Sequence, residues 1–451
     1  RRFTMFAVSS MQMRRVEHAD AIIHDFDISV GDYSRVIGSL GLLSALLVLG
    51  VGPLIQRFSS RPLILVGLSL KGAVFATTSF APTFGALAAM LLPTCPLHAI
   101  GEQPTHHVLM KGYFRKLLPS AIATVNMGYS LCGALTPLLL APAISAYGWR
   151  SCYLFLGILY IAGGAFAFCA VRPGPLEVKI SPDPRTRNDE YDHSCHVTDE
   201  TQALQGKVGA VNGTLYSTNG EFENGKAGKS SSSSSSSLSS PARSSVPDGY
   251  SVREALRTPR FYALMAISFL TNLWEGVIVM HFLLILQMES KLTLVKASYF
   301  YSTQYLCAII GKQSYAALYP ILPRAAHFYV LPLLFCLCHL LINAPQPGGG
   351  FAITTDEMRI SIFTVVYGLS FGYTHSLHLA QPALLLGRKD LAIFQTLYYG
   401  ANFLGGPFGG VIVGAVHDTY GSYSPALMIS FAATALMYVI DLYLARVPEL
   451  I

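Results

Sequence analysis

Long apolar tracts alternate with short polar turns along most of the chain. Eleven of these tracts have the roughly 20 mostly apolar residues that a helix needs to cross a bilayer. Gly and Pro inside several tracts are compatible with membrane helices, because neighbouring helices re-satisfy the freed backbone groups. The pattern therefore predicts an all-α membrane protein without a sheet. The tracts are 34–56, 62–80, 84–110, 119–146, 151–171, 261–287, 297–322, 326–344, 360–386, 391–416 and 424–445.

A polar segment separates the fifth tract from the sixth. Residues 172–260 hold 11 of the 25 Asp and Glu and 11 of the 31 Lys and Arg, and 230–237 is an unbroken Ser run. Such a composition cannot bury a core and predicts disorder, with a short amphipathic helix expected near 250–260. The predicted organisation is a helical bundle, a linker and a second helical bundle, at 1–171, 172–257 and 258–451.

Eleven is an odd number of spans for two equal halves. The chain begins with Arg1, and residues 3–13 form a short apolar stretch before Arg14, Arg15 and Glu17. We interpret this as the remnant of a truncated first span, which restores two halves of six. The alternative is an eleven-span protein with a polar amino-terminal tail.

Lys and Arg in the short loops predict the orientation, because cytoplasmic loops carry an excess of them. One side holds nine and the other four. The nine-residue side, which includes the linker, is expected to be cytoplasmic. The nine are Arg57, Arg61, Lys111, Arg115, Lys116, Arg324, Arg388, Lys389 and Arg446; the four are Arg150, Lys291, Lys296 and Arg359.

The composition narrows the class of function. Only 12% of the residues are charged against 52% hydrophobic, which argues against a soluble enzyme. The formal charge of +6 resides beside apolar spans rather than on a polar face, so no nucleic-acid partner is expected. The eight cysteines form no Cys-x-x-Cys, and no nucleophile–base or metal-ligand spacing appears. Neither a cofactor nor enzymatic catalysis is predicted.

Several short motifs occur along the chain, each at the start or end of a predicted span or within one. A glycine-rich pattern at the end of the span 391–416 combines small residues for close helix packing with an Asp to close the loop and a Gly to turn the chain. A Tyr-Phe-x-Lys signature precedes the span 119–146, a Gly-Trp-Arg the span 151–171, and an Arg pair the span 62–80. The residues are Gly406, Pro407, Gly410, Asp418, Gly421 and Tyr423; Tyr113, Phe114 and Lys116; Gly148, Trp149 and Arg150; the run 367–372; and Arg57 and Arg61.

Together these motifs resemble the monocarboxylate transporter family of the major facilitator superfamily. The resemblance implies two six-helix bundles in the plasma membrane, alternating access, and for some members a single-span accessory chaperone. In the family, span 8 carries an Asp for proton coupling and, four residues later, an Arg that pairs with the substrate carboxylate. Ala308 and Lys312 occupy these positions here. The family's coupling Lys of span 1 lies in the missing part, so the resemblance does not establish proton symport.

Charges at membrane depth mark candidate functional residues, because each costs about 2.5–3.5 kcal/mol even on the gentlest scale. Lys312 leads as a point charge for an anion, and Tyr305 shares its helical face. Glu102 and Glu275 are equal candidates for a proton acceptor, whereas Lys71 is interpreted as paired or reaching the interface. The predicted substrate-binding set is Lys312, Tyr305, Glu275, Asn272, His375, Ser376 and Asn402.

Three functions remain open from the sequence. The first is a carrier of a small organic anion, with a monocarboxylate as the leading candidate. The second is a facilitator of a neutral or zwitterionic compound, such as an aromatic amino acid. The third is a transport-inactive membrane protein that binds another protein.

The charge asymmetry makes a topological prediction. An epitope tag inserted at residue 240 should bind antibody only in permeabilised cells, because the linker is expected in the cytoplasm. A tag in the short loop at 291, on the opposite side, is the matched control and should be labelled on intact cells. Labelling of the residue 240 tag without permeabilisation would contradict the orientation.

Overall fold

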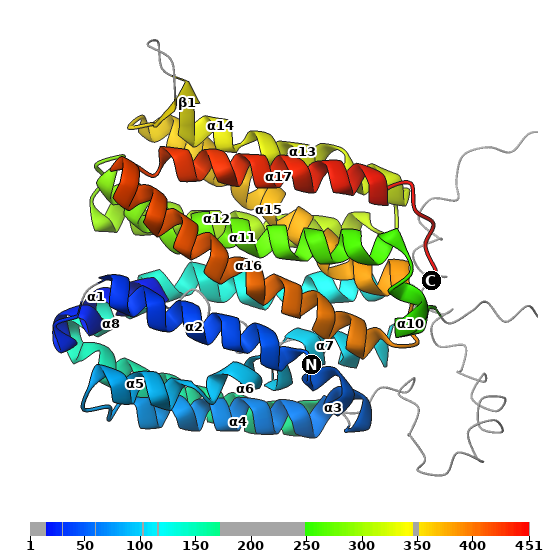
Figure 1. Cartoon of the computed structure of the whole chain (residues 1–451), viewed down its shortest axis with the longest axis horizontal. Helices are drawn as coiled ribbons and strands as arrows, with labels where there is room; N and C mark the ends of the chain where they lie inside the picture. Colours follow the sequence, from blue (N-terminus) through cyan, green and yellow to red (C-terminus); the bar gives the residue numbers. More distant parts are fainter. Residues whose placement is uncertain are drawn as a thin grey trace, which may run out of the picture. The chain divides into compact units, whose positions relative to one another are not determined.

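The computed structural model describes residues 15–28, 30–58, 60–101, 103–114, 117–171, 249–345 and 351–450. Almost all described regular structure is helical (Figure 1). The N half comprises α1 (Arg15–Phe26), α2 (Val30–Val48), α3 (Val51–Arg57), α4 (Ser60–Thr78), α5 (Phe84–Leu91), α6 (Thr94–Gly101), α7 (Gln103–Lys111) and α8 (Leu118–Ala170). The C half comprises α10 (Val252–Ala255), α11 (Pro259–Met288), α12 (Leu294–Leu318), η1 (Arg324–Phe328), α13 (Val330–Leu337), α14 (His339–Ile342), β1 (Asn343–Pro345), β2 (Phe351–Ile353), α15 (Glu357–Leu386), α16 (Leu391–Tyr420) and α17 (Ser424–Leu444).

Each of the eleven predicted tracts coincides with helical segments. Tract 84–110 is divided into α5, α6 and α7, with Pro93 in the turn between the first two. By length and hydropathy, four helices among the described residues could cross a membrane; they are Ala146–Ala170, Pro259–Met288, Arg324–Ile342 and Ser424–Leu444. The remaining tracts carry more polar residues or are interrupted. The expected helix near 250–260 is α10, whereas the rest of the linker up to residue 248 lies outside the described residues.

The prediction of a chain without a sheet missed a small hairpin. β1 and β2 pair antiparallel, with Asn343 opposite Ile353. Ser424 at the start of α17 donates its hydroxyl to Asn343 Oδ1 and to the main-chain O of Phe351, both at 2.8 Å. These bonds satisfy buried polar groups in the turn between α14 and α15. The hairpin thus fixes a loop and leaves the helical fold unchanged.

The turn inside α8 separates two predicted spans. Gly148 has φ +74°, a left-handed conformation that glycine adopts at little cost. The next two side chains point back to the first helix: Trp149 Nε1 and Arg150 Nη1 both donate to Asp25 Oδ2, at 3.2 and 2.5 Å. The Gly-Trp-Arg motif therefore reverses the chain and joins this turn to α1.

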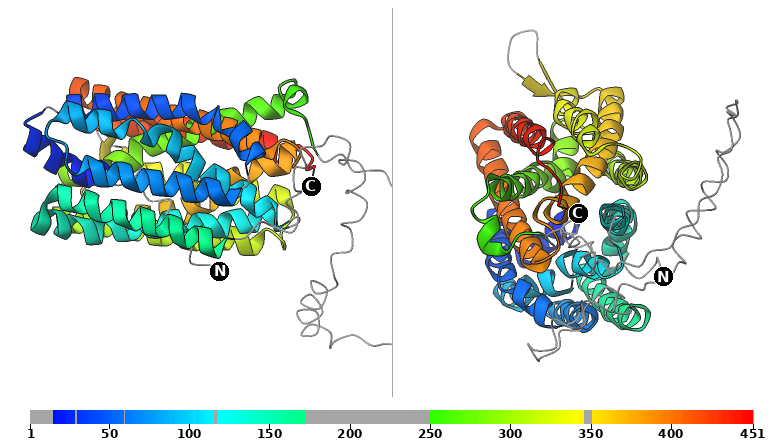
Figure 2. Two further views of the ribbon diagram at one scale, coloured as in Figure 1. Left: turned by 90° about the horizontal axis from the view of Figure 1, so that it is seen from below. Right: turned by 90° about the vertical axis from the view of Figure 1, so that its right-hand side faces the viewer.

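Hydrophobic clusters form within each half and between them. One lies in the N half, and a second occupies mainly the C half. A third combines Val48 and Ile122 from the N half with Leu379, Ala392 and Tyr399 from the C half. Viewed along the helices, the halves form two groups, with α2 beside α16 (Figure 2). The central contact between the halves is therefore packed rather than open in this structure.

Large apolar side chains also cover the outside of the helices. Leu139, Phe155 and Ile158 in α8 are 63, 62 and 57% exposed, and Val411 in α16 is 67% exposed. Extensive exposure of this kind is unusual for a protein surrounded by water. It agrees with the lipid contact predicted from the apolar tracts.

Glycines bring helix pairs within the C half into backbone contact. A Cβ at Gly405 or Gly409 of α16 would lie 2.2 Å from the main-chain O of Phe269 or Leu273 in α11. A Cβ at Gly372 of α15 would lie 2.1 Å from the main-chain O of Ala308 in α12. Small residues at such interfaces allow the close packing on which helix association in lipid depends. Of the two motif glycines predicted to allow close packing, Gly406 lies close to Asn272, whereas nothing lies within 4 Å of a Cβ at Gly410; the backbone contact is made at the neighbouring Gly405 and Gly409.

This contact predicts a difference between neighbouring glycines. Gly409→Ala should destabilise the protein by about 1–3 kcal/mol, because its methyl group meets main-chain atoms that cannot move alone. Gly410→Ala is the matched control, since nothing lies within 4 Å of its added Cβ. Thermal unfolding of the purified protein in detergent measures both. Equal unfolding temperatures for the two variants would contradict the packing role.

Candidate functional site

Lys312 lies at the contact between the two halves. It occurs in α12 and is fully buried. Its Nζ donates a hydrogen bond of 2.9 Å to the main-chain O of Asn126 in α8. A buried ammonium needs such partners, because burial removes its hydration. The residue singled out by its charge thus bridges two helices from different halves.

Tyr129, one helical turn after Asn126, organises the surroundings of Lys312. The Nζ of Lys312 lies 5.0 Å from the centroid of the Tyr129 ring, within the range of a cation–π interaction. The same ring meets His375 and Tyr305 edge to face, with centroids 6.3 and 6.4 Å apart. Three of the residues predicted separately are therefore brought together around one tyrosine that the sequence reading did not single out.

Glu275 adds a carboxylate to this cluster. Its Oε1 lies 4.0 Å from His375 Nδ1, and electrostatic attraction links it to Lys312. Neither of the two atoms in the 4.0 Å contact has a hydrogen-bond partner among the described residues. The ion pairs formed by the described residues include none at Lys312. The cation is therefore held by a neutral carbonyl and a ring face rather than by a close carboxylate.

A chain of side chains continues from Asn126 to another helix of the C half. Asn126 Nδ2 lies 3.0 Å from His107 Nε2 in α7, and His107 Nδ1 lies 3.5 Å from Gln395 Oε1 in α16. An amide NH₂ only donates, so Nε2 accepts and the proton lies on Nδ1, which donates to Gln395. Asn126 also donates to the main-chain O of Ile122. The contact between the halves therefore contains a continuous polar connection from α12 to α16.

Three other predicted substrate residues have partners in helix packing. Asn272 of α11 donates to the main-chain O of Asn402 in α16 at 2.5 Å, and Asn402 Nδ2 donates to the main-chain O of Ser268 at 3.2 Å. Ser376 donates to the main-chain O of Gly372 in its own helix. The two asparagine bonds join α11 to α16, the serine bond lies within α15, and all three satisfy buried groups. A substrate role for these three remains a prediction.

Two further buried polar contacts lie in the C half. His378 Nε2 is 2.9 and 3.0 Å from the carboxylate oxygens of Asp441 in α17, and both side chains are fully buried. Trp274 Nε1 donates to His339 Nε2 at 2.6 Å, while His339 Nδ1 lies 3.0 Å from the main-chain O of Cys336. Tryptophan can only donate, which places the imidazole proton on Nδ1. Asp441 and His339 were not predicted, because only the fold reveals their partners.

The other charged candidates lie apart from Lys312 or outside the described residues. Glu102 and Lys116 lie outside the described residues. Lys71 is fully buried in α4, with its Nζ 5.6 Å from the centroid of the Tyr160 ring in α8. The contact of Lys71 with Tyr160 therefore lies within the N half.

The remaining motif residues lie mainly at helix ends. Tyr113 and Phe114 follow α7 and are each 38% exposed, and Arg57 is exposed at the end of α3. Arg61 Nε donates to the main-chain O of Phe168 at 2.7 Å. These contacts belong to turns and helix packing rather than to the Lys312 cluster.

The motif at the end of α16 closes its loop differently from the prediction. Gly421 has φ +66° and ends the helix, as expected of the turning glycine. Asp418 is 86% exposed and lies 3.7 Å from its neighbour His417. Instead, Glu289 from the end of α11 accepts the main-chain N–H of Tyr423 at 2.8 Å. Tyr423 also packs its ring on His417, 4.4 Å between centroids.

The glycine-proline pair of that motif lies farther inside α16. Pro407 packs against Gly41 of α2, where an added Cβ would lie 2.7 Å from the proline ring. Gly406 faces Asn272 of α11, and a Cβ added at Gly406 would lie 3.2 Å from Asn272 Nδ2, closer than ordinary packing. The pair thus contacts both halves.

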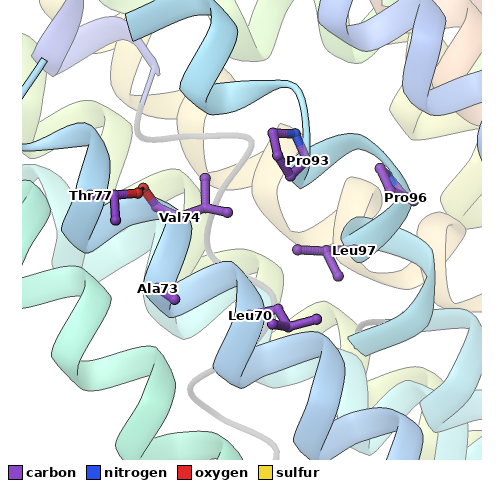
Figure 3. A pocket seen from close by; sticks show the side chains of 7 residues that line it. All are labelled: Leu70, Ala73, Val74, Thr77, Pro93, Pro96 and Leu97. Carbon is purple, nitrogen blue, oxygen red and sulfur yellow. Dashed lines mark hydrogen bonds between the residues drawn. The ribbon is translucent and has the colours of Figure 1, made fainter.

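A shallow groove of about 400 Å³ lies between α4 and the α5–α6 turn (Figure 3). Its lining is apolar and carries no charged group, so it offers nothing to recognise an ionic solute. Among the described residues, no three His, Cys, Asp or Glu side chains gather as metal ligands. The groove is lined by Leu70, Ala73, Val74, Thr77, Pro93, Pro96 and Leu97.

Comparison with known proteins identifies the class. The family model of the Major Facilitator Superfamily matches residues 18–410, and the chain belongs to that family. Over 166 residues it is 31% identical to the multidrug resistance protein D of Escherichia coli (strain K12), which covers 36% of this chain and 40% of that protein. The crystal structure of FucP, a transporter of the superfamily in the outward conformation, has a TM-score of 0.60 at 11% identity and covers 98% of this chain and 96% of that one.

Family membership indicates the general class of the protein. The chain belongs to a family of integral, multi-pass membrane transporters rather than to a family of enzymes. The predicted all-α major facilitator fold is confirmed. The low identity to FucP shows the fold alone, and the chain spans two fifths of the bacterial relative.

Proposed function

We propose that this transporter carries a small organic anion with a single carboxylate, and that Lys312 binds that carboxylate. The observation that carries the proposal is the fully buried ammonium between the halves, held by the main-chain O of Asn126 and the ring of Tyr129. Substrate sites in such transporters lie where the two repeats meet near the bilayer midplane. Lys312 has both the position and the charge for this role.

The balance of interactions favours a carboxylate at Lys312. A hydrogen bond from an ammonium to a carbonyl has one ionised partner, whereas one to a carboxylate has two and gains the attraction between opposite charges. The neutral carbonyl of Asn126 is thus a weaker partner than a substrate anion would be. A lone Lys provides a point charge with rotatable donors rather than the rigid fork of Arg. This suits one carboxylate better than a larger planar anion.

The resemblance to monocarboxylate transporters supports the same substrate class, with one departure explained by packing. Ala308, at the position where the family has an Asp, is fully buried against α15, where the main chains of Ala308 and Gly372 meet. An Asp side chain at position 308 would have little room, because α12 and α15 approach each other there so closely that α15 has a glycine, Gly372. We propose that Glu275, across from His375, takes over the acidic role in proton coupling.

A zwitterionic substrate is the second candidate, and Glu275 is the observation that favours it. Its Oε1 is buried without a hydrogen-bond partner among the described residues, and electrostatic attraction links Glu275 to Lys312. A substrate ammonium would satisfy this oxygen while its carboxylate binds Lys312. The aromatic rings of Tyr129 and Tyr305 would contact the organic part of either substrate.

The proposal includes the two bundles, the linker and the accessory chaperone that the sequence analysis predicts. Bundles 1–171 and 258–451 would move against each other in the plasma membrane, with the linker 172–257 in the cytoplasm. An accessory single-span chaperone would act in delivery to the surface rather than in binding the solute.

The first test removes or reshapes the charge. Lys312→Ala should lower the affinity for a transported carboxylate about ten- to a hundredfold, since a hydrogen bond to a charged group contributes about 1.5–3 kcal/mol. Lys312→Arg keeps the charge and should retain part of the uptake. Uptake of radiolabelled pyruvate by liposomes containing the purified variants measures both.

Lys71→Ala is the matched control, because Lys71 is equally buried but contacts the N half. Uptake by Lys312→Ala equal to that of the parent, at equal amounts of folded protein, would contradict the role of Lys312. Absence of pyruvate uptake in the parent, with uptake of an amino acid instead, would favour the zwitterionic substrate.

The second test separates the two roles of Glu275. Glu275→Gln removes the negative charge at nearly constant size. If Glu275 accepts the coupled proton, the variant should exchange internal for external pyruvate but lose the stimulation of uptake by an inward proton gradient. If Glu275 binds a substrate ammonium, amino-acid uptake should fall about tenfold or more with exchange affected equally. Unchanged gradient stimulation and unchanged substrate affinity would exclude both roles.

A further inference from the structure

We propose that Asn126 and His107 form a lock between the halves, which holds the substrate-free carrier closed at one end and which a carboxylate releases at Lys312. The release by a carboxylate rests on the proposed function, whereas the lock between the halves does not. It arises from the polar connection Lys312–Asn126–His107–Gln395, in which residues of the N half lie between two helices of the C half.

The lock lies toward the end of the bundle where the linker leaves and re-enters. His107 is four residues before the end of α7, and Gln395 is four residues after the start of α16, which corresponds to about 6 Å from each helix end. At that same end, Arg388 Nη2 donates to the main-chain O of Lys111 at 2.7 Å, and Lys111 Nζ donates to the main-chain O of Arg388. Opening this end must break both sets of contacts.

The side chains of the lock match as donors and acceptors. Asn126 donates to His107, which in its neutral form donates to Gln395. All three are fully buried or nearly so, with exposures of 1% for Asn126 and 0% for His107 and Gln395. Buried hydrogen bonds in such a network are costly to leave unmade. The connection therefore favours the arrangement in which the halves touch.

In the connection Lys312–Asn126–His107–Gln395, the hydrogen bond of Lys312 is the one that a bound solute could replace. Lys312 contributes a hydrogen bond to a main-chain carbonyl, whereas the other contacts are between side chains. A carboxylate at Lys312 adds the attraction between opposite charges to the hydrogen bond, and we infer that it replaces the carbonyl. Asn126 then loses its contact with α12, and within the connection only the long 3.5 Å contact from His107 to Gln395 still joins the two halves. Substrate binding and opening of this end become linked.

Unpaired atoms around the lock allow a clean substitution. Gln395 Nε2 is buried without a hydrogen-bond partner among the described residues. Gln395→Leu therefore removes the contact to His107 together with an unsatisfied polar atom, and it should fold. His107→Leu removes both contacts of the imidazole. His107→Gln is the rescue variant, because its amide can accept from Asn126 and donate to Gln395.

The test measures the separation of the halves without substrate. Nitroxide labels at Phe58→Cys and Ile321→Cys, in a background without the eight native cysteines, report the distance between exposed positions on the two halves at the linker end. Double electron–electron resonance on the purified full chain should show one short distance in the parent. Gln395→Leu and His107→Leu should increase the ratio of long to short distances about two- to tenfold.

The controls make the result specific. His107→Gln should return the distances to those of the parent. His106→Leu changes the neighbouring buried histidine, which forms none of the described contacts of the lock, and should leave the distances unchanged. A Gln395→Leu distribution identical to the parent's would overturn the lock. If His107→Leu does not fold, Gln395→Leu decides alone.

A second arm tests the release. Sodium pyruvate added to the parent should increase the long distances as the substitutions do, with sodium chloride as the ionic control. If the substitutions open the carrier but pyruvate, acetate and benzoate leave the parent closed, the lock stands and the carboxylate substrate is wrong. If pyruvate is transported but Gln395→Leu stays closed, the proposed function stands and the lock is wrong.

Discussion

The arrangement of this transporter depends on one ammonium that is fully buried between helices. Lys312 is fully buried between α8 and α12, and its partners are a carbonyl oxygen and a tyrosine ring. A charge in this position is costly unless its surroundings stabilise it. The surrounding residues therefore have to be polar, aromatic or oppositely charged, and they have to come from both halves. Glu275, His375, Tyr129 and Asn126 satisfy this requirement.

Backbone contacts at glycines hold pairs of helices together within the C half. Glycines allow α12 to approach α15 and α11 to approach α16 until main-chain atoms touch. The helix that carries Lys312 is thereby fixed to the helix that carries His375, and the helix that carries Glu275 is fixed to α16. Buried pairs such as His378 with Asp441 add directional bonds to this packing. Substrate binding can then alter the contact between halves without disturbing either half.

Much of the fold could be predicted from the sequence, because lipid imposes a strong and simple rule on it. Apolar tracts of sufficient length predicted the helices, whereas the glycines that allow α11 to approach α16, Gly405 and Gly409, were identified only from the structure. The hairpin formed by β1 and β2 escaped because three-residue strands in a loop have no periodicity to detect. The loop contact assigned to Asp418 is formed by Glu289, since which acid reaches the turn depends on the spacing of α11 and α16.

The candidate site was predictable only in part, for a physical reason. Lys312 and Glu275 stand out because charges are rare in membrane helices, and the structure places them in electrostatic contact. Asn126 and Tyr129 did not stand out, because Lys312 uses the main-chain oxygen of the one and the ring face of the other. Neither a backbone carbonyl nor an aromatic face distinguishes a residue in a sequence. Asn272 and Asn402, which did stand out, bond across α11 and α16.

The neutral partners of Lys312 explain how its ammonium can be accommodated both in the empty carrier and in a carrier that holds a substrate. An ammonium that bonded a protein carboxylate at close range would have to break a strong ion pair before it could accept a substrate anion. An ammonium without any partner would destabilise the empty protein. A main-chain carbonyl and a ring face lie between these extremes: they stabilise Lys312 when no solute is present, yet a carboxylate can replace the carbonyl with a net gain. Because the carbonyl belongs to the opposite half, that replacement also changes the contact between halves. In the function that we propose, recognition of the anion and movement of the helices thus depend on the same hydrogen bond.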